Sequence, residues 1–229
     1  MKNLFLFVLL LVASAECILL ITGKVSNNSV RILYESSNSN ENQKEIFVIL
    51  KNLKNSKEVQ KKKILLENHP KIIKFENLSL NSEFKVEFNV EKKINENFVT
   101  FKTFSNEKQK KIKFLVMSCD RYVDDKDDEF YSELMKKDSN FDVVLHLGDQ
   151  IYADVIGKNM TDDQSYEDIL EEYRKLYRLT WGTSIKQQFF RKGSHLMIPD
   201  DHDIINNLDA PLLYTHLQEM LFAGRQAYY

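Results

Sequence analysis

The 229-residue sequence contains little cysteine, proline, glycine or tryptophan: two cysteines, three prolines, six glycines and one tryptophan. Two cysteines allow one disulfide at most, which excludes a framework held by several disulfides. With 43% hydrophobic and 29% charged residues, the composition also excludes a collagen, a wholly disordered chain and a polytopic membrane protein. The chain also has no excess of one charge sign. It contains 32 Lys and Arg and 34 Asp and Glu, which gives a net charge of -2. A near-neutral chain of this kind has no evident nucleic-acid binding surface.

The first 15 residues have the features of a secretory signal peptide. Lys2 supplies a positive charge, residues 4–12 form an apolar run, and Ala13-Ser14-Ala15 fits a small-x-small cleavage site. We therefore expect cleavage after Ala15 and a protein that is secreted or located in the lumen of the secretory pathway. The alternative is an uncleaved anchor, because residues 18–21 extend the apolar stretch beyond Glu16. Only in that case do we expect membrane association.

Three Asn-x-Ser/Thr triplets, at Asn27, Asn77 and Asn159, become glycosylation candidates if the chain is secreted. Such triplets also arise by chance in a sequence rich in Asn and Ser. Both interpretations stay open for each of the three.

The region from residue 17 to residue 105 contains short β-rich runs separated by polar turns. The alternation of Phe84, Val86, Phe88 and Val90 is typical of a strand with one buried face. Similar runs occupy residues 18–25, 30–35, 45–50, 71–75 and 98–104. This pattern predicts an antiparallel β-sandwich of immunoglobulin or fibronectin III type. The Lys-rich residues 51–63 are expected to be a solvated loop and a charged edge strand.

The region from residue 112 to residue 229 has a different pattern. Continuous apolar runs at residues 113–118 and 141–147 predict strands buried on both faces, and the helical spacing in residues 127–137 predicts a helix between them. Strand, helix and strand in this order form a βαβ unit. A longer helix over residues 164–179 and a third apolar run at residues 196–199 follow. The sequence therefore predicts an α/β region after the sandwich, with a last helix that begins at Pro211.

Each of the three apolar runs ends in a cluster of polar residues: residues 118–121, 148–152 and 200–203. Loops at the carboxyl ends of parallel strands meet at one edge of a sheet, so these clusters are expected to converge. Gly148 permits a sharp turn, and Asp149 after it is able to bridge two metal ions. The phenolate of Tyr152 is a hard ligand suited to iron(III). Carboxylate, thiolate, phenolate and imidazole groups together predict a site for one or two metal ions.

Three sequence blocks carry a resemblance to a known family: FLVMSCDR, HLGDQIYAD and PDDHDIINN, within residues 113–207. They resemble the first three motif blocks of the PhoD-like alkaline phosphatases, which belong to the calcineurin-like metallophosphoesterases. The Gly-Asp-x-x-Tyr element of the second block is shared with the related purple acid phosphatases. The β-rich region before the blocks is also similar to the N-terminal domain common in this family.

The resemblance implies a metal-dependent phosphate ester hydrolase, in which a metal-activated hydroxide attacks the phosphoryl group of a monoester or diester. It implies that Cys119 ligates iron, Asp149 bridges the metals, Tyr152 adds a phenolate and Asp201 is a further ligand. His202 would contact the phosphoryl group or protonate the leaving oxygen. The metals implied are iron and calcium, and other members of the superfamily use zinc or manganese. Three further residues are weaker candidates for phosphate or metal contacts: Arg121, Asn206 and Arg174.

Several of these residues also have a structural interpretation. Cys119 could be a buried small hydrophobic residue or could pair with Cys17, and Tyr152 could pack in the core. Asp200 could cap a helix or turn, and His146 inside its strand is expected to be a satisfied core histidine.

The family's pattern continues after the third block with further metal-binding histidines, whereas only His216 follows Asp203 here. We therefore expect a phosphatase truncated after the third block. The alternatives are a secreted, catalytically inactive fragment that binds a partner through its β-sandwich, and a protein that binds a single metal without hydrolysis.

Overall fold

The computed structural model describes residues 18–36, 44–90, 97–107, 111–122, 124, 128–137, 140–156, 164–207 and 218–228. The predicted signal peptide, Cys17, Asn159, His216 and the predicted start of the last helix at Pro211 lie outside these ranges. Within them, no helix combines the length and apolar character that crossing a bilayer requires.

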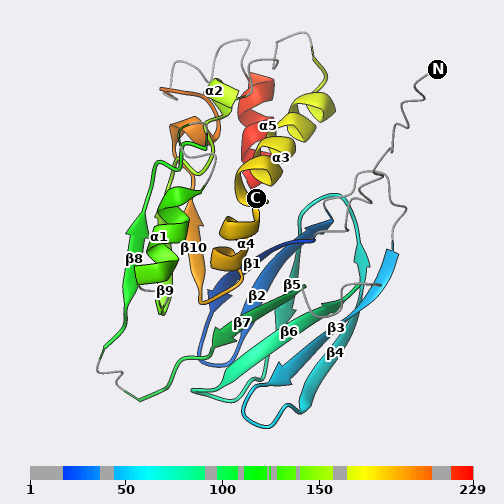
Figure 1. Cartoon of the computed structure of the whole chain (residues 1–229). Coiled ribbons are helices and arrows are strands. Elements are labelled where there is room, and N and C mark those ends of the chain that lie inside the picture. The colour runs from blue at the N-terminus through cyan, green and yellow to red at the C-terminus, as the bar shows by residue number, and fades with distance from the viewer. Residues whose placement is uncertain are drawn as a thin grey trace, which may run out of the picture.

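Two antiparallel sheets form the N-terminal part (Figure 1). One sheet has the order β1-β2-β5, with β1 Ile18–Val25, β2 Val30–Ser36 and β5 Lys71–Phe75. The other has the order β4-β3-β6-β7, with β3 Lys44–Asn52, β4 Glu58–Leu66, β6 Glu83–Asn89 and β7 Phe98–Lys102. Alternate side chains of both sheets enter one core, in agreement with the predicted β-sandwich. The lysines of β4 lie on an edge strand, as predicted.

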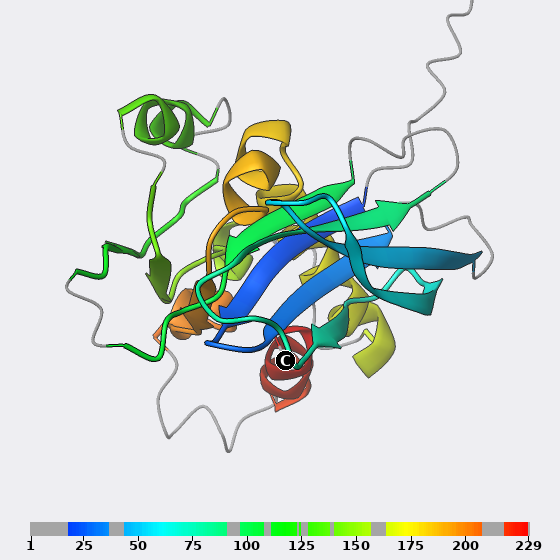
Figure 2. The ribbon, with the colours of Figure 1, turned by 90° about the horizontal axis from the view of Figure 1, so that it is seen from below.

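Strand β1 contributes side chains to two hydrophobic cores. Ile18 and Leu20 belong to the core of the sandwich, whereas Leu19 and Ile21 belong to the core of the second part. The cause is the alternation of side chains along a strand, which points neighbours to opposite faces. Figure 2, seen from below, shows β1 and β2 in blue near the middle of the molecule.

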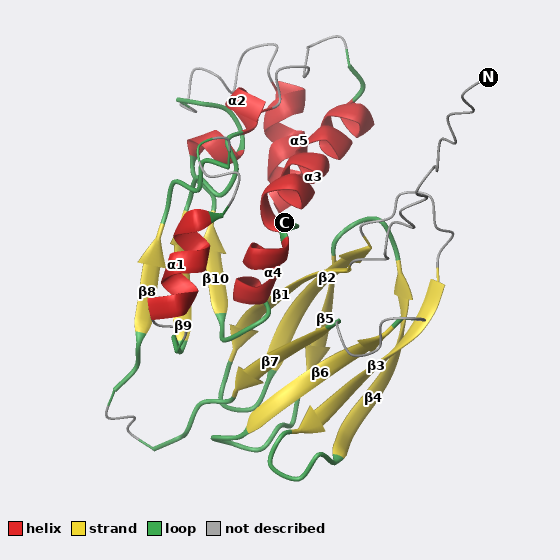
Figure 3. Cartoon of the chain, in the orientation of Figure 1, coloured by secondary structure: helices red, strands yellow, loops and turns green. Residues whose placement is uncertain are grey.

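The second part is built on a parallel sheet with the order β10-β9-β8. Its strands are β8 Phe114–Met117, β9 Val143–Leu147 and β10 His195–Ile198. Helix α1, Glu129–Lys137, connects β8 with β9, so the predicted βαβ unit is present. The remaining helices are α2 Ala153–Ile156, α3 Tyr166–Trp181, α4 Ser184–Phe190, α5 Gln218–Tyr228 and the short 3-10 helix η1 Asp201–Asp203. Figure 3 shows these helices gathered in one half of the molecule and the sandwich strands in the other.

The prediction that β8 and β9 are buried on both faces is wrong. Residues such as Leu115 and Met117 pack in the core on one face of the sheet. On the other face, Val116 is 54% exposed and Leu147 is 47% exposed. An apolar run shows that a strand has two apolar faces, and whether both are covered depends on other elements. The described helices pack on only one of them.

Helix α3 begins where a side chain caps it. The Oγ atom of Ser165 accepts a hydrogen bond from the backbone N–H of Asp168, at 3.2 Å. One face of the helix is apolar and buried, and the Tyr173 hydroxyl donates to the backbone oxygen of Ile204 at 2.6 Å. Tyr173 and Tyr177 of this helix therefore belong to the core.

Hydrogen bonds join the sandwich to the second part. The backbone N–H of Leu20 donates to Oε1 of Gln187 at 2.9 Å, and the Arg191 guanidinium donates to the backbone oxygen of Ile18 at 2.9 Å. The Arg178 guanidinium also pairs with the buried carboxylate of Glu35 at 2.6 Å. Because these bonds tie β1 and β2 to α3 and α4, the two parts share one continuous packed structure.

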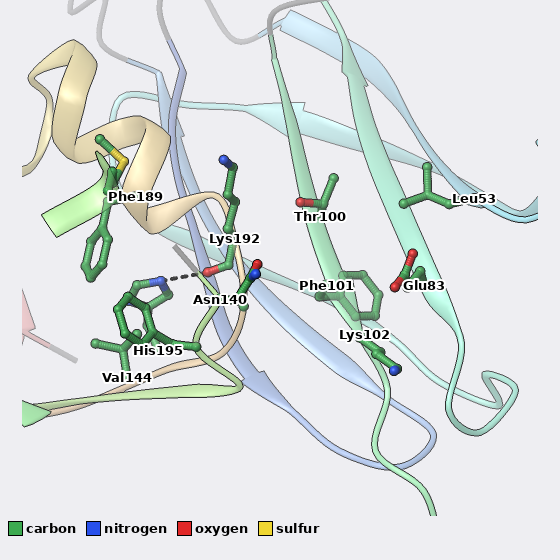
Figure 4. Close-up of a pocket in the computed structure, with 13 residues that line it drawn as sticks. Leu53, Glu83, Thr100, Phe101, Lys102, Asn140, Val144, Phe189, Lys192 and His195 are labelled. Carbon is green, nitrogen blue, oxygen red and sulfur yellow. Dashed lines mark hydrogen bonds between the residues drawn. The ribbon is translucent and has the colours of Figure 1, made fainter. Parts of the chain in front are cut away.

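A pocket of about 300 Å³ lies between the two parts (Figure 4). Thr100, Phe101 and Lys102 line it from β7, and Val144 and His195 line it from the amino ends of β9 and β10. The His195 Nε2 atom lies 2.9 Å from the backbone oxygen of Lys192, a contact drawn in Figure 4. The predicted polar clusters are at the carboxyl ends of the same strands, so this pocket is separate from them.

Candidate metal centre

The loops that follow the three parallel strands meet, as predicted. The backbone N–H of Cys119 donates to the oxygen of Gly148 at 3.3 Å, and that of Asp120 donates to the oxygen of Asp149 at 2.8 Å. The third loop approaches equally closely, since a Cβ atom on Gly148 would lie 2.3 Å from the Cβ of Asp200. Only glycine fits this position, which also has a φ of +86°.

Two predicted ligands have backbones in the left-handed region. Cys119 has a φ of +60° and Asp149 a φ of +54°. This conformation is uncommon for residues other than glycine, and it aims both side chains away from the ordinary course of the strand. The backbone hydrogen bonds between the two loops hold this geometry.

Asp149 lies at the centre of the cluster and is 7% exposed. Its Oδ2 atom accepts a hydrogen bond from the Tyr152 hydroxyl at 3.3 Å and from the Cys119 thiol at 3.5 Å. Its Oδ1 atom is buried and has no hydrogen-bond partner among the described residues. A buried carboxylate oxygen without a partner is costly, and a cation would satisfy it.

Asp201 and His202 bring further ligand atoms to Asp149. One atom of each of the three side chains lies within 4.8 Å of the others. The two carboxylates and the Cys119 thiol beside them suit a transition metal, and the His202 imidazole lies within reach of the same position. The donor set therefore fits the metal site predicted from the sequence. Asp201 is also held in place, because its Oδ2 accepts from the backbone N–H of Asn207 at 2.6 Å.

His202 is oriented by the carboxylate of Asp154 and by the aromatic ring of Tyr152. Its Nδ1 atom lies 2.7 Å from Oδ1 of Asp154, and its ring centroid lies 4.3 Å from that of Tyr152. Partial burial lowers the pKa of His202, but the hydrogen bond and charge of Asp154 and the charges of Asp149 and Asp201 outweigh it. The net effect raises the pKa of His202 above its ordinary value.

The surroundings of Tyr152 keep its hydroxyl protonated. Burial raises the pKa of Tyr152, and the hydrogen bond with Cys119 and the negative charge of Asp149 raise it further. Binding as a phenolate would therefore require a cation strong enough to displace the proton. The Arg121 guanidinium lies 5.8 Å from the centroid of this ring.

Asp203 joins two of the loops, a role that the sequence did not indicate. It is fully buried, its Oδ1 accepts from the N–H groups of Gln150 and Ile151 at 2.8 and 2.9 Å, and its Oδ2 accepts from that of Asp200 at 3.0 Å. Burial raises the pKa of Asp203 to about 6, although these backbone hydrogen bonds oppose the shift. Asp200 caps η1 as expected, and the reciprocal bond from Asp203 completes a capping box. An acidic residue three positions after a cap is the signal that could have predicted the capping box, whereas the hydrogen bonds to Gln150 and Ile151 have no local signal.

The structure does not bring all the weaker candidates to the centre. Arg121 is close to Tyr152 and pairs with Asp124 at 3.1 Å. Asn206 is exposed on the turn after η1. Arg174 lies on α3, where its guanidinium is 4.0 Å from Glu171 and lines a different pocket beside Glu35. The interpretation of Arg174 as a phosphate contact has no support from this geometry.

Other predicted residues have clear positions. Cys119 is an exposed free thiol, so the alternative of a buried hydrophobic residue is wrong. His146 is a satisfied core histidine as predicted, with its Nε2 atom 3.0 Å from Nδ1 of the buried His195. Asn77 is exposed in a turn, and the Asn27 side chain donates to Oδ1 of Asn106 at 2.6 Å.

Comparisons with known proteins place the second part of the chain in a family. The sequence model of a family described as PhoD-like phosphatase matches residues 114–229. This match includes all three loops of the centre and covers about half of the chain. A search of curated proteins finds no match.

Solved structures resemble the chain only distantly. The sensor domain of the anti-sigma factor RsgI4 in Pseudobacteroides cellulosolvens is 13% identical with a TM-score of 0.33, and the match covers 41% of this chain and 98% of that one. The β-glucuronidase of Parabacteroides merdae is 12% identical with a TM-score of 0.35, covering 92% of this chain and 32% of that one. The FMN-binding β-glucuronidase from Facaelibacterium prausnitzii L2-6 is 11% identical with a TM-score of 0.35, covering 92% and 38%.

Proposed function

The chain belongs to the PhoD-like phosphatase family, and from this premise we propose that it is a metal-dependent phosphate ester hydrolase. The observation that carries the proposal is the unpartnered, buried Oδ1 atom of Asp149, placed among the side chains of Cys119, Tyr152, Asp201 and His202. Without a cation, this oxygen would lose the hydration it has in water and gain nothing in return.

The residues of the centre divide into ligands and one acid. Cys119, Asp149, Tyr152 and Asp201 would hold the metals, with iron and calcium as the proposed pair and zinc or manganese as the alternatives. When bound, the metals would make hydroxide available from water near neutral pH and offset negative charge on the phosphoryl oxygens. His202 would donate a proton to the leaving oxygen through Nε2, because Nδ1 is engaged by Asp154. Its raised pKa keeps that proton available.

Metal-dependent hydrolysis by the purified chain tests this proposal. We expect p-nitrophenyl phosphate or its bis ester to be hydrolysed when iron and calcium are added, and Asp149→Ala to abolish both turnover and metal binding. Glu133→Ala is the matched control, since it removes an exposed carboxylate of α1 whose ion-pair partner is Lys136. An absence of turnover together with an absence of bound metal would contradict the proposal and favour the inactive binding protein. Stoichiometric metal without turnover would favour the single-metal binding protein.

The proposed tyrosinate gives a separate spectroscopic signature. A phenolate bound to iron(III) gives a purple colour through charge transfer, and we expect Tyr152→Phe to remove it while other ligands keep the metal. A colour that persists in this variant would contradict the role of Tyr152.

We also propose that the chain is secreted, on the strength of the apolar N-terminal run and the Ala13-Ser14-Ala15 cleavage pattern. N-terminal sequencing of the protein from the medium is expected to begin at Glu16. A product that stays with the cell and retains its first residues would contradict secretion.

A further inference from the structure

A fully buried lysine pairs with Asp120, the residue that follows Cys119 in its loop. Lys186, on α4, is 0% exposed, and its Nζ atom lies 2.9 Å from each carboxylate oxygen of Asp120 and 3.7 Å from Oδ1 of Asp128. The Tyr131 hydroxyl, on α1, donates to Oδ2 of Asp120 at 2.7 Å. A buried ammonium is tolerated only when paired in this way. The Asp120 carboxylate is therefore anchored to two helices.

The backbone of Asp120 is anchored to a different element. Its N–H donates to the oxygen of Asp149 at 2.8 Å, in the loop after β9. The side chain of Asp120 is thus held by Lys186 and Tyr131, and its backbone is held by the loop after β9. The residue before it is Cys119, whose left-handed backbone places Sγ 3.5 Å from Oδ2 of Asp149.

The ion pair between Lys186 and Asp120 matters more for the position of the loop than for the stability of the fold. Replacing a buried ion pair by apolar groups is often neutral or stabilising, because desolvation offsets most of the attraction between the charges. The same ion pair fixes the direction and distance of the Asp120 carboxylate from the Lys186 ammonium, and apolar contacts would not fix them. Contacts that hold a metal ligand from outside the metal site orient that ligand, and their loss lowers metal affinity by about 10- to 100-fold.

We propose that Lys186 is a positioning residue for Cys119, which it holds in place by anchoring the carboxylate of Asp120. The metal-ligand role of Cys119 rests on the function proposed above, whereas the anchoring of the loop is independent of any metal. The two statements can therefore be tested by different measurements.

The first measurement is hydrogen exchange in the double variant Lys186→Met with Asp120→Asn. The charges of Lys186 and Asp120 are removed together, and the buried carboxylate of Asp128 then lacks the ammonium that lies 3.7 Å from it in the unaltered chain. We expect the backbone amide at position 120 to exchange about tenfold faster, because the side-chain anchor of the loop is lost, while amides of α3 keep their protection. The matched control is Lys136→Met with Glu133→Gln, which removes an exposed ion pair of 2.9 Å on α1. Unchanged exchange at position 120 would overturn the proposal.

The second measurement is titration with cobalt(II), which gives a near-ultraviolet thiolate-to-metal absorption when a cysteine is a ligand. We expect this absorption in the unaltered chain and its loss in Cys119→Ser. In the double variant we expect a weaker band and an affinity about tenfold lower, while unchanged exchange of the α3 amides shows that the fold persists. A full band at full affinity in the double variant would overturn the positioning role of Lys186. Absence of the band from the unaltered chain would instead contradict Cys119 as a ligand, and hydrogen exchange would still decide the anchoring.

Discussion

Gly148 is the residue at which the three loops of the centre come closest together. It has a positive φ, and a methyl group there would overlap Asp200 at 2.3 Å. Gly193 provides a comparison, since its φ is also positive but the nearest heavy atom to a methyl group is the Phe141 oxygen at 3.3 Å. The two glycines therefore share a conformational requirement and differ in the space around them.

We predict that Gly148→Ala lowers the free energy of unfolding by about 3 kcal/mol, through both backbone strain and overlap with the third loop. Gly193→Ala is expected to cost about 1 kcal/mol, the usual penalty of a left-handed backbone alone. Urea unfolding of the two variants measures the difference. Equal losses would show that Asp200 moves aside without cost.

Asp154 favours protonation of His202 through the contact of 2.7 Å between its Oδ1 atom and Nδ1 of the ring. We predict that Asp154→Asn lowers the pKa of His202, because the variant removes the negative charge that stabilises the imidazolium. An NMR titration of the His202 ring measures the shift, with Glu133→Gln as the control for loss of an exposed carboxylate. A rise in this pKa, or no change, would contradict the interpretation.

At the scale of elements, β9 and β10 share a buried pair of imidazoles. Burial lowers the pKa of His146 to about 3, with a smaller contribution from the charge of His195. Burial also lowers the pKa of His195 to about 4, against the backbone hydrogen bonds of Lys192 and Phe189. Both rings stay neutral in the folded protein, whereas in the unfolded chain they take up protons near the ordinary value of 6.5.

The folded state therefore loses stability as the pH falls from about 6.5 towards 4, at about 1.4 kcal/mol per pH unit for each ring. Above pH 6.5 this contribution is fully present. We predict that His146→Gln removes about half of this pH dependence, since glutamine keeps a hydrogen-bond donor to His195 and does not titrate. Urea unfolding of both proteins at pH 7 and pH 5 provides the comparison. The same loss of stability on acidification in both would exclude the pair as its cause.

Local patterns predicted most of these elements, and contacts between distant residues account for what they missed. The alternation in residues 84–90 and the apolar run of β9 depend only on neighbouring residues, so both strands were predictable. Helix α4 was not predicted, because Lys186 and Gln187 resemble surface residues until their partners Asp120 and Leu20 are known. The loops of the centre were predictable because each follows a strand. The roles of Asp154 and Asp203 depend on hydrogen bonds across 48 to 53 positions.

At the scale of the whole molecule, Trp181 reports on one core while Leu20 lies in the other. Trp181 is the single tryptophan of the chain. We predict that Leu20→Ala, which opens a cavity in the sandwich, destabilises the protein by about 2–5 kcal/mol. We expect the fluorescence transition of Trp181 to shift together with the far-ultraviolet circular dichroism. Ile72→Ala is the control, because Ile72 is 60% exposed on β5. A fluorescence midpoint that stays in place would show that the two parts unfold separately.

The position of β1 between the two cores also bears on how quickly the protein folds. Its backbone partners in the second part lie far along the chain: Leu20 bonds Gln187 across 167 positions, and Ile18 bonds Arg191 across 173. Contacts this distant in sequence close large loops of chain, and proteins dominated by them fold slowly. During synthesis, the apolar face formed by Leu19 and Ile21 lacks its contacts with α4 and β10 until those elements have been made. For that interval the segment is a target for chaperones and for aggregation.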